Sequence, residues 1–230
     1  MTHFLEIILI KRWLFCCLFF LVAACSHRNE NQINDFEKIK LINQEQRYNR
    51  DLRTIVQAEK NVKQGDLILR TGRDFTSDIM RRVSTKDKTY SHCGLASFEH
   101  DTLFVYHAIG GEWNPDQKLR RDPFELFCNP YESKGFGIYR YQLNRNEQLQ
   151  IVNLIRNSYI KGIMFDMQFN LDSNDRMYCS EFVYKTIERA TGYEIKIPVD
   201  TFNSLKFVAV DNLFINPFCK EVKRVKFQTE

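Results

Sequence analysis

Three residues carry side chains suited to nucleophilic catalysis: Cys179, His92 and His107. The cysteine lies near the start of segment 177–192 (MYCSEFVYKTIERATG), whose apolar residues recur at helical spacing. This pattern predicts a helix with Cys179 at its amino end, where unpaired backbone N–H groups and the helix dipole favour a thiolate. The same N–H groups can hold an oxyanion. The alternative is a buried structural cysteine, which is a common environment for this residue type.

The residues around this segment predict how the helix begins, ends and faces solvent. Gly192 favours a stop just past the last turn. Glu181 and Lys185 are spaced as an i,i+4 ion pair, on a face that we expect to be exposed. The preceding polar run offers three capping residues: Asp172, Asn174 and Asp175.

A cysteine nucleophile needs a neighbouring base and usually a third polar group that orients the base. Among the five histidines, His92 and His107 lie on two predicted strands, 90–98 and 102–109, joined by a short turn. A two-residue turn places the two histidines opposite each other. A four-residue turn places His107 opposite Gly94, with His92 as its diagonal neighbour. Both registers put the rings on one face, which makes His92 the candidate base and His107 the candidate orienting group. The alternative is two strand histidines with no shared role.

A metal site is a competing interpretation of the same side chains. His92, His107 and Cys179 are all zinc-ligand types and would form an open site. Cys93 would point away from it, because adjacent residues of a strand project to opposite faces. No Cys-x-x-Cys or His-x-x-x-His spacing supports metal binding, so we expect neither a metal nor another cofactor.

The composition is that of a globular protein with room for one substantial core. The chain has 230 residues, of which 43% are hydrophobic. Its net charge of +4 is too weak and too dispersed to indicate a nucleic-acid partner.

The first 25 residues have the pattern of an export signal. Lys11 and Arg12 precede the apolar run 13–25, which is typical of a signal peptide. The run ends in Val22-Ala23-Ala24-Cys25, which resembles a bacterial lipobox and predicts that Cys25 is acylated. The alternatives are a plain signal peptide and an uncleaved anchor. Export permits disulfides, and the sequence leaves open whether Cys128 pairs with Cys219.

These patterns divide the chain into a lipoprotein signal peptide (1–24), a lipidated tether with an N-terminal helical segment (25–61) and a folded domain (62–230). We expect the helical segment to pack outside the main core. We expect Ile79, Met80 and Val83 of a helix over 75–83 to face inward. The other elements expected in the domain are strands over 67–69, 136–143 and 222–227 and helices over 122–127 and 146–159.

The order of short motifs along the domain resembles the circularly permuted branch of the NlpC-type papain-like cysteine hydrolases, the YiiX/YebB group. The resemblance spans about residues 62–205. The matching pieces are Gly65-Asp66-Leu67-Ile68, Tyr90-Ser91-His92-Cys93-Gly94, Val105-Tyr106-His107-Ala108, and Phe165-Asp166-Met167-Gln168-Phe169 leading to Tyr178-Cys179-Ser180-Glu181-Phe182-Val183.

The resemblance implies a permuted papain-like α+β fold, with an antiparallel sheet packed against the helix that carries the catalytic cysteine. It implies Cys179 as nucleophile and His92 as base. The third position is often Glu in this group and is His107 here, as in lecithin retinol acyltransferase-like relatives. The expected protein is a lipid-anchored cell-envelope hydrolase acting on a peptide or peptidoglycan-type amide. The alternatives are a lipid esterase or acyltransferase and a non-catalytic binding lipoprotein.

Overall fold

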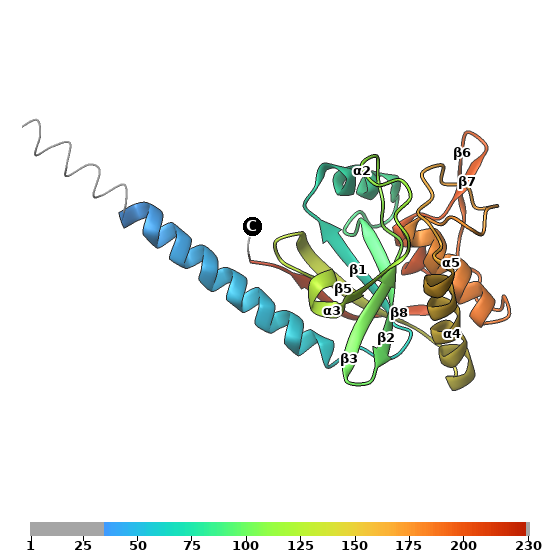
Figure 1. Cartoon of the computed structure of the whole chain (residues 1–230), viewed down its shortest axis with the longest axis horizontal. Helices are drawn as coiled ribbons and strands as arrows, with labels where there is room; N and C mark the ends of the chain where they lie inside the picture. The colour runs from blue at the N-terminus through green and yellow to red at the C-terminus, as the bar shows by residue number, and fades with distance from the viewer. Residues whose placement is uncertain (1–34, 229–230) are drawn as a thin grey trace, which may run out of the picture. The chain divides into compact units, whose positions relative to one another are not determined.

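The computed structural model describes residues 35–228 (Figure 1). The predicted leader and the predicted lipidation site, Cys25, lie outside the described residues. Within 35–228, no helix is both long enough and apolar enough to cross a membrane. The first helix spans residues 35–59. The elements that follow are β1 (Leu67–Gly72), α2 (Phe75–Val83), β2 (His92–Glu99), β3 (Thr102–His107), β4 (Arg120–Pro123), α3 (Phe124–Phe127), β5 (Ser133–Tyr141), α4 (Arg145–Lys161), α5 (Cys179–Ala190), β6 (Asp200–Phe202), β7 (Leu205–Phe207), the 3-10 helix η1 (Val210–Leu213) and β8 (Cys219–Lys226).

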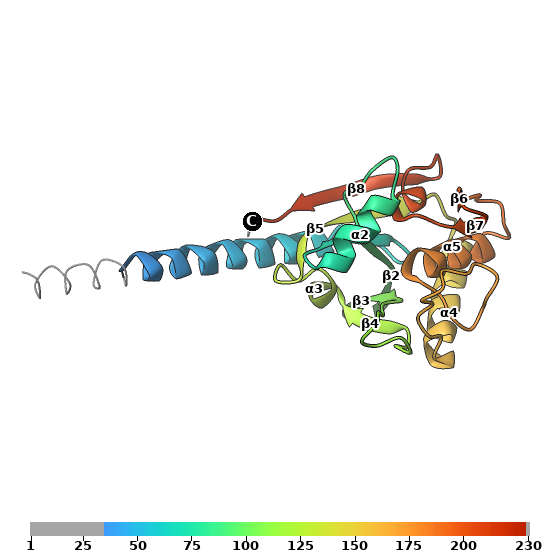
Figure 2. The ribbon, with the colours of Figure 1, turned by 90° about the horizontal axis from the view of Figure 1, so that it is seen from above.

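Six strands form one sheet in the order β4-β3-β2-β1-β5-β8, and β6 pairs with β7 as a separate hairpin. Every neighbouring pair in the large sheet is antiparallel. The α+β class with an antiparallel sheet, expected from the sequence, is therefore confirmed. In Figure 2, β8 runs along one side of the molecule and β4 lies across from it.

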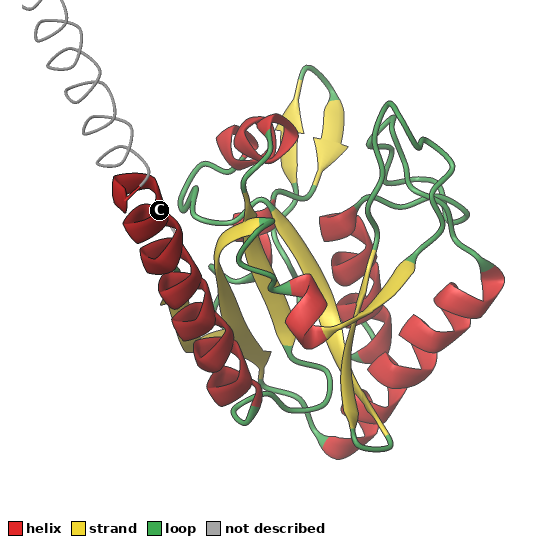
Figure 3. Ribbon diagram, turned by 60° about the vertical axis from the view of Figure 1, so that its left-hand side comes forward, coloured by secondary structure: helices red, strands yellow, loops and turns green. Residues whose placement is uncertain are grey.

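One face of the sheet is covered by α4 and α5 (Figure 3). Phe182, Val183 and Ile187 of α5 are fully buried, as the helical spacing of these residues predicts. They pack in the same cluster as Leu69 and Cys93, which project from β1 and β2. Each large apolar side chain buried in this way contributes about 1.5–3 kcal/mol to folding.

The opposite face of the sheet is covered in part by the end of the first helix. The compact unit that holds the sheet begins at Tyr48, earlier than residue 62. Ile55 and Ala58 are fully buried and join Phe124 and Phe127 in a second core cluster. The expectation that this segment packs outside the core is therefore wrong for its last turns.

The amino end of α5 is capped differently from the prediction. The N-cap residue is Tyr178, and its backbone N–H donates to Glu181 Oε2 at 3.2 Å, so the polar run before it does not cap the helix. The ion pair between Glu181 and Lys185 is present at 2.7 Å, but the Glu181 side chain is fully buried rather than exposed. Gly192 follows the helix with a φ of +59°, the left-handed conformation that favours glycine at this position.

Two short helices also differ from the sequence prediction. Helix α2 has the predicted bounds, but none of its residues is buried, and Ile79 and Val83 are 41% and 39% exposed. Helix α3 begins at Phe124, because Asp122 and Pro123 belong to β4. This shift moves Asp122 onto the sheet, beside the histidines.

Candidate active site

The two candidate histidines meet on one face of the β2–β3 hairpin. The strands pair with Leu95 opposite Tyr106, and continuing this register places His107 opposite Gly94. His92 is then the diagonal neighbour of His107, and its Nε2 lies 2.8 Å from His107 Nδ1. This is the second of the two predicted registers, although the turn consists of only His100 and Asp101.

Gly94 provides the space for this contact. A Cβ atom at position 94 would lie 3.0 Å from His107 Cβ and 2.6 Å from the Tyr106 carbonyl oxygen. Any larger residue would push the two strands apart or displace His107.

A carboxylate extends the histidine pair into a chain of three residues. His107 Nε2 lies 3.0 Å from Asp122 Oδ2. Strand β4 pairs with β3 so that Arg120 faces His107, which puts Asp122 two residues along on the same face. Arg120 Nη2 also lies 2.7 Å from Asp122 Oδ2. Burial raises the pKa of Asp122, but the hydrogen bond from His107 and the charges of His107 and Arg120 outweigh it and hold that pKa below its ordinary value.

The ionised carboxylate determines which nitrogen of each ring carries the proton. Asp122 only accepts hydrogen bonds, so His107 donates Nε2–H and presents its Nδ1 lone pair to His92. His92 must then donate Nε2–H to His107, which leaves His92 Nδ1 as a free basic nitrogen. The three hydrogen-bonded residues are arranged as a base oriented by a hydrogen-bonded partner, with one additional imidazole, that of His107, between the base and the carboxylate.

Burial and nearby cations keep both imidazoles neutral. His92 is 8% exposed and His107 is fully buried. The pKa of His92 lies well below its ordinary value, because of burial first and then electrostatic repulsion by Arg70, by His107 when that ring is protonated, and by Arg120. Burial also lowers the pKa of His107, and the hydrogen bond to Asp122 offsets part of that effect. At neutral pH, His92 is therefore an unprotonated base.

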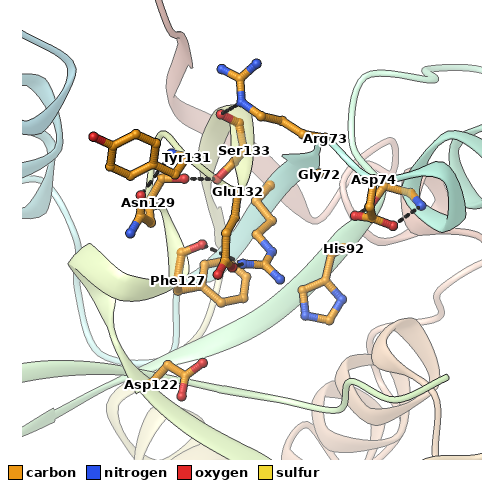
Figure 4. A network of polar contacts seen from close by, with 12 residues as sticks. Gly72, Arg73, Asp74, His92, Asp122, Phe127, Asn129, Tyr131, Glu132 and Ser133 are labelled. Atoms are coloured by element: carbon orange, nitrogen blue, oxygen red, sulfur yellow. Dashed lines mark hydrogen bonds and ion pairs between the residues drawn. The ribbon is translucent and has the colours of Figure 1, made fainter. Parts of the chain in front are cut away.

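Phe127, the last residue of α3, packs against both histidine rings, and Arg70 of β1 holds Phe127 in place. The Phe127 ring lies 5.6 Å from the His92 ring and 5.0 Å from the His107 ring, measured between centroids. Arg70 Nη1 donates to the Phe127 carbonyl oxygen at 3.1 Å and lies 3.5 Å from Glu132 Oε2. Figure 4 shows Phe127 and Glu132 on the same side of the sheet as His92.

Cys179 is the first residue of α5 and is half-buried. It packs against the core cluster that contains Cys93 of β2, and the Cys93 thiol is the largest cause that lowers the pKa of Cys179. Burial opposes it, and the backbone N–H groups of Ser180 and Cys93 add to the lowering. Burial raises the pKa of the Cys93 thiol well above its ordinary value. Cys179 is therefore the acidic thiol of the pair and Cys93 the donor.

The structure does not join the cysteine to the histidines directly. None of the hydrogen bonds described within 35–228 connects Cys179 with His92. His92 and Cys93 are successive residues of β2, so their side chains leave opposite faces of the sheet. Cys179 packs against the core cluster of Cys93 on the face covered by α5, while the hydrogen-bonded histidines begin at the adjacent residue on the other face.

Two residues of this site were not predicted as members of it. Asp122 was assigned to the start of a short helix, although a buried histidine pair requires a polar partner somewhere in the fold. Cys93 was expected to point away from the chemistry because its side chain leaves the other face from His92. The sequence shows this alternation, but it does not show that α5 packs on the face of Cys93.

The remaining candidates are not brought together. Cys93, Cys128, Cys179 and Cys219 are all free, and Cys128 and Cys219 are buried in different core clusters. A disulfide between Cys128 and Cys219 is therefore not formed. No group of three or more His, Cys, Asp or Glu side chains within the described part of the chain is arranged to hold a metal ion.

Comparisons with known proteins identify one named homologue. No family model matches the sequence. The chain is 26% identical over 132 residues to an uncharacterised protein of Escherichia coli strain K12, YiiX. The match covers 57% of this chain and 60% of YiiX, so the chain matches less than two thirds of that relative's length.

A solved structure shows the same fold. The crystal structure of the metalloprotein YiiX from Escherichia coli O157:H7 matches with a TM-score of 0.59 and 18% identity. The match covers 72% of this chain and 99% of that structure. The chain is thus homologous to YiiX by sequence and by structure.

Proposed function

We propose that this YiiX homologue is a cysteine hydrolase with a permuted papain-like, NlpC-type fold that cleaves an amide bond in the bacterial cell envelope. The observation that carries the proposal is the hydrogen-bonded chain His92–His107–Asp122, which begins at the residue next to Cys93, a member of the core cluster against which Cys179 packs. A buried, oriented base beside an acidified thiol at a helix start is the combination that nucleophilic catalysis by cysteine requires.

In the proposed reaction, the Cys179 thiolate attacks the carbonyl carbon of the substrate. The N–H groups at the amino end of α5, including those of Cys179 and Ser180, donate to the oxyanion. His92 Nδ1, which has taken its proton from the Cys179 thiol, passes that proton to the leaving amine as the C–N bond breaks, and a thioester forms on Cys179. Water then attacks the thioester, and His92 Nδ1 takes the proton from that water. His107 and Asp122 stabilise the imidazolium that forms transiently on His92.

The proposal requires a rearrangement at the start of β2, because His92 is not hydrogen-bonded to Cys179. His92 is the first residue of β2. At this position β2 is paired with β1 on one side, and its pairing with β3 on the other side begins only at Leu95. Because His92 and Cys93 project from opposite faces of β2, the backbone at His92 must move for Nδ1 to reach the thiol when substrate binds. Hydrogen bonds of this kind often tighten only in the complex with substrate.

The homologous E. coli structure is described as a metalloprotein, but the candidate side chains of this chain, all within 35–228, do not form a metal site. Both ring nitrogens of His107 are engaged, by His92 and by Asp122. Cys179 packs against the core cluster of Cys93, on the face of the sheet opposite to the histidines. These donors do not converge on one point, so they do not fit a metal ion, and the proposed chemistry uses none.

The proposed place of action rests on the sequence pattern at the amino end. We propose that acylated Cys25 anchors the protein to a membrane of the cell envelope, where the domain meets peptides and peptidoglycan fragments. A lipid anchor limits the reaction to substrates at or near that membrane.

A lipid ester hydrolase or acyltransferase is the second candidate. Phe202 and Leu205, on the β6–β7 hairpin, are 67% and 44% exposed. Val208, just after β7, donates its N–H to the Tyr178 hydroxyl and accepts from Ser180, so this hairpin is connected to the residues on both sides of Cys179. Apolar side chains in that position would suit an acyl chain.

Paired acylating probes test both candidates. A peptide amide and an ester with the same acyl group are offered to the purified protein, and the thioester on Cys179 is detected by intact mass. We expect acylation by the amide in wild type, none in Cys179→Ala, and strongly slowed acylation in His92→Ala. His100→Asn, in the exposed turn, is the matched control. Acylation by the ester alone would favour the second candidate, and no acylation by either would leave a binding lipoprotein.

A further inference from the structure

We infer that α2 and the β6–β7 hairpin form a docking face for the surface of an anionic lipid bilayer. The face consists of five apolar side chains that project into solvent: Phe75, Ile79, Val83, Phe202 and Leu205. The inference goes beyond the proposed function, because it concerns how the folded domain itself contacts lipid, whereas the proposed function concerns the anchor and the reaction.

Helix α2 presents an apolar stripe that the rest of the domain does not cover. Phe75, Ile79 and Val83 follow one another at intervals of four residues, so they lie along one side of the helix. Phe75 is 79% exposed, and no residue of α2 is buried. The sequence predicted that Ile79 and Val83 face the core. In the structure they face solvent, which is the arrangement of an amphipathic helix that lies on a membrane surface.

The β6–β7 hairpin extends this face, because both elements are fixed to the same short helix, η1. Asp211 of η1 accepts through Oδ2 from the backbone N–H groups of residues 85–87, which follow α2 closely, at 3.0, 2.7 and 3.3 Å. Asn212 of η1 donates to Asp200 Oδ2, at the start of the hairpin, at 2.7 Å. Figure 1 shows α2 and the hairpin at the same end of the domain. The apolar side chains of the two elements therefore belong to one region of the surface.

The charges around this face favour an anionic partner. Four exposed cations of the same segments form no ion pair within the described residues: Arg82, Lys86, Lys88 and Lys206. The acids of these segments are engaged, since Asp74 caps α2 and Asp78 and Asp87 each pair with an arginine. The surplus positive charge suits the negative potential of phosphate headgroups, which attracts exposed lysines and arginines.

A bilayer suits this mixture of side chains better than a folded protein does. Lipids rearrange around each apolar side chain while their headgroups meet the cations, so no matched pocket is needed. The proposed acylation of Cys25 would keep the domain near such a surface, and the face would then need little affinity of its own. Val208, next to the hairpin, is hydrogen-bonded to Tyr178 and Ser180 on either side of Cys179, so docking would bring the start of α5 close to the headgroups.

The test uses the full chain, reconstituted into vesicles of phosphatidylglycerol whose acyl chains carry bromine, which quenches tryptophan fluorescence inside the bilayer. Both native tryptophans, Trp13 and Trp113, are replaced by Phe. One tryptophan is then introduced by Phe75→Trp or, as the matched control, by Ile160→Trp. Ile160 is 80% exposed, close to the value for Phe75, but it lines a pocket with His100 at the β2–β3 turn.

The Phe75→Trp protein should lose emission and shift to shorter wavelength on the brominated vesicles, whereas the Ile160→Trp protein should emit as it does on vesicles without bromine. Brominated phosphatidylcholine vesicles should quench Phe75→Trp much less, because they lack the negative charge that the cations need. Adding Arg82→Glu and Lys88→Glu to Phe75→Trp should have the same effect, with circular dichroism as the check on the fold. The phosphatidylcholine comparison decides the role of charge even if that charge-reversed protein folds poorly.

Equal quenching of Phe75→Trp and Ile160→Trp, or quenching of Phe75→Trp that is the same on the two kinds of vesicle, would overturn the inference. Unquenched emission of Phe75→Trp on the phosphatidylglycerol vesicles would also overturn it and would leave a protein as the partner of this face. Because fluorescence is the readout, these outcomes are independent of whether the protein hydrolyses any substrate.

Discussion

At the scale of single residues, the proton positions in the site depend on Asp122. Its carboxylate fixes the tautomer of His107, and through that ring it fixes which nitrogen of His92 is free. An amide has nearly the same shape as a carboxylate but can donate as well as accept. The charge of the side chain at position 122, rather than its shape, should therefore determine which nitrogen of His92 is free to act as a base.

Asp122→Asn should lower the rate of Cys179 acylation by roughly 10²–10⁴-fold, the range associated with losing an effective general base. The substituted side chain no longer stabilises the imidazolium. Acylation is followed by intact mass under single-turnover conditions, and near-ultraviolet circular dichroism checks the fold. Asp101→Asn, in the exposed turn, is the control. An unchanged rate in Asp122→Asn would remove the carboxylate from the mechanism.

Cys93 should control the acidity of Cys179. The Cys93 thiol is the largest cause that lowers the pKa of Cys179, so Cys93→Ala should raise that pKa. The pH at which iodoacetamide alkylation of Cys179 reaches half its maximal rate should therefore move upward. Cys93→Ser, which retains a donor, should move it less, and Cys128→Ala should not move it. A midpoint that is the same in Cys93→Ala and wild type would contradict this assignment.

At the scale of secondary-structure elements, the first turn of α5 contains a buried acid. Glu181 accepts the Tyr178 N–H and pairs with Lys185, whose ammonium group also donates to the Ser173 carbonyl. These contacts join the helix start to the loop before it. Burial raises the pKa of Glu181 from 4.5 to about 7, although Lys185 opposes the shift.

Glu181→Gln should change how stability depends on pH. The folded protein holds a proton on Glu181 that the unfolded chain loses, so this residue's contribution to stability is complete below pH 4.5 and is lost as pH rises through about 7. Relative to wild type, Glu181→Gln should therefore gain about 2–3 kcal/mol between pH 5 and pH 8.

Urea unfolding at the two pH values measures this difference, with Glu112→Gln in an exposed loop as the control. His92 and His107 have lowered pKa values, so they favour unfolding as pH falls below about 6.5, but this trend is common to both proteins and cancels. A constant difference between Glu181→Gln and wild type would show that Glu181 stays ionised across the range.

The elements themselves were largely predictable from the sequence, and their docking was not. The apolar spacing of α5 and the alternation of β2 are local patterns, so they indicated that Cys179 starts a helix and that His92 and His107 share a face. Which face of β2 receives α5 is decided by packing between distant segments. The sequence therefore does not show that Cys179 packs on the face of the sheet that holds Cys93. The same reason explains Asp122, which reaches His107 only through the pairing of β4 with β3.

At the scale of the whole molecule, the proposed lipid anchor should determine where the protein is found. Cys25→Ser should release the protein from the membrane fraction or leave it as an unprocessed precursor, because acylation needs the thiol. Fractionation of cells followed by intact mass of the protein distinguishes the two. Cys219→Ser, a buried cysteine of the domain, serves as the control. Membrane association of Cys25→Ser with an unchanged mass would argue against lipidation.

The order of the strands along the chain also has a consequence for synthesis. His92, His107 and Asp122 lie on three successive strands, β2, β3 and β4, which form a local meander. Such contacts form early, since they close short loops. Cys179 leaves the ribosome much later, after β5 and α4, and its helix docks on a strand that is already paired. A nascent chain that ends before α5 therefore carries His92, His107 and Asp122 without Cys179. Under the proposed chemistry, an acyl-enzyme therefore forms only after translation has passed α5.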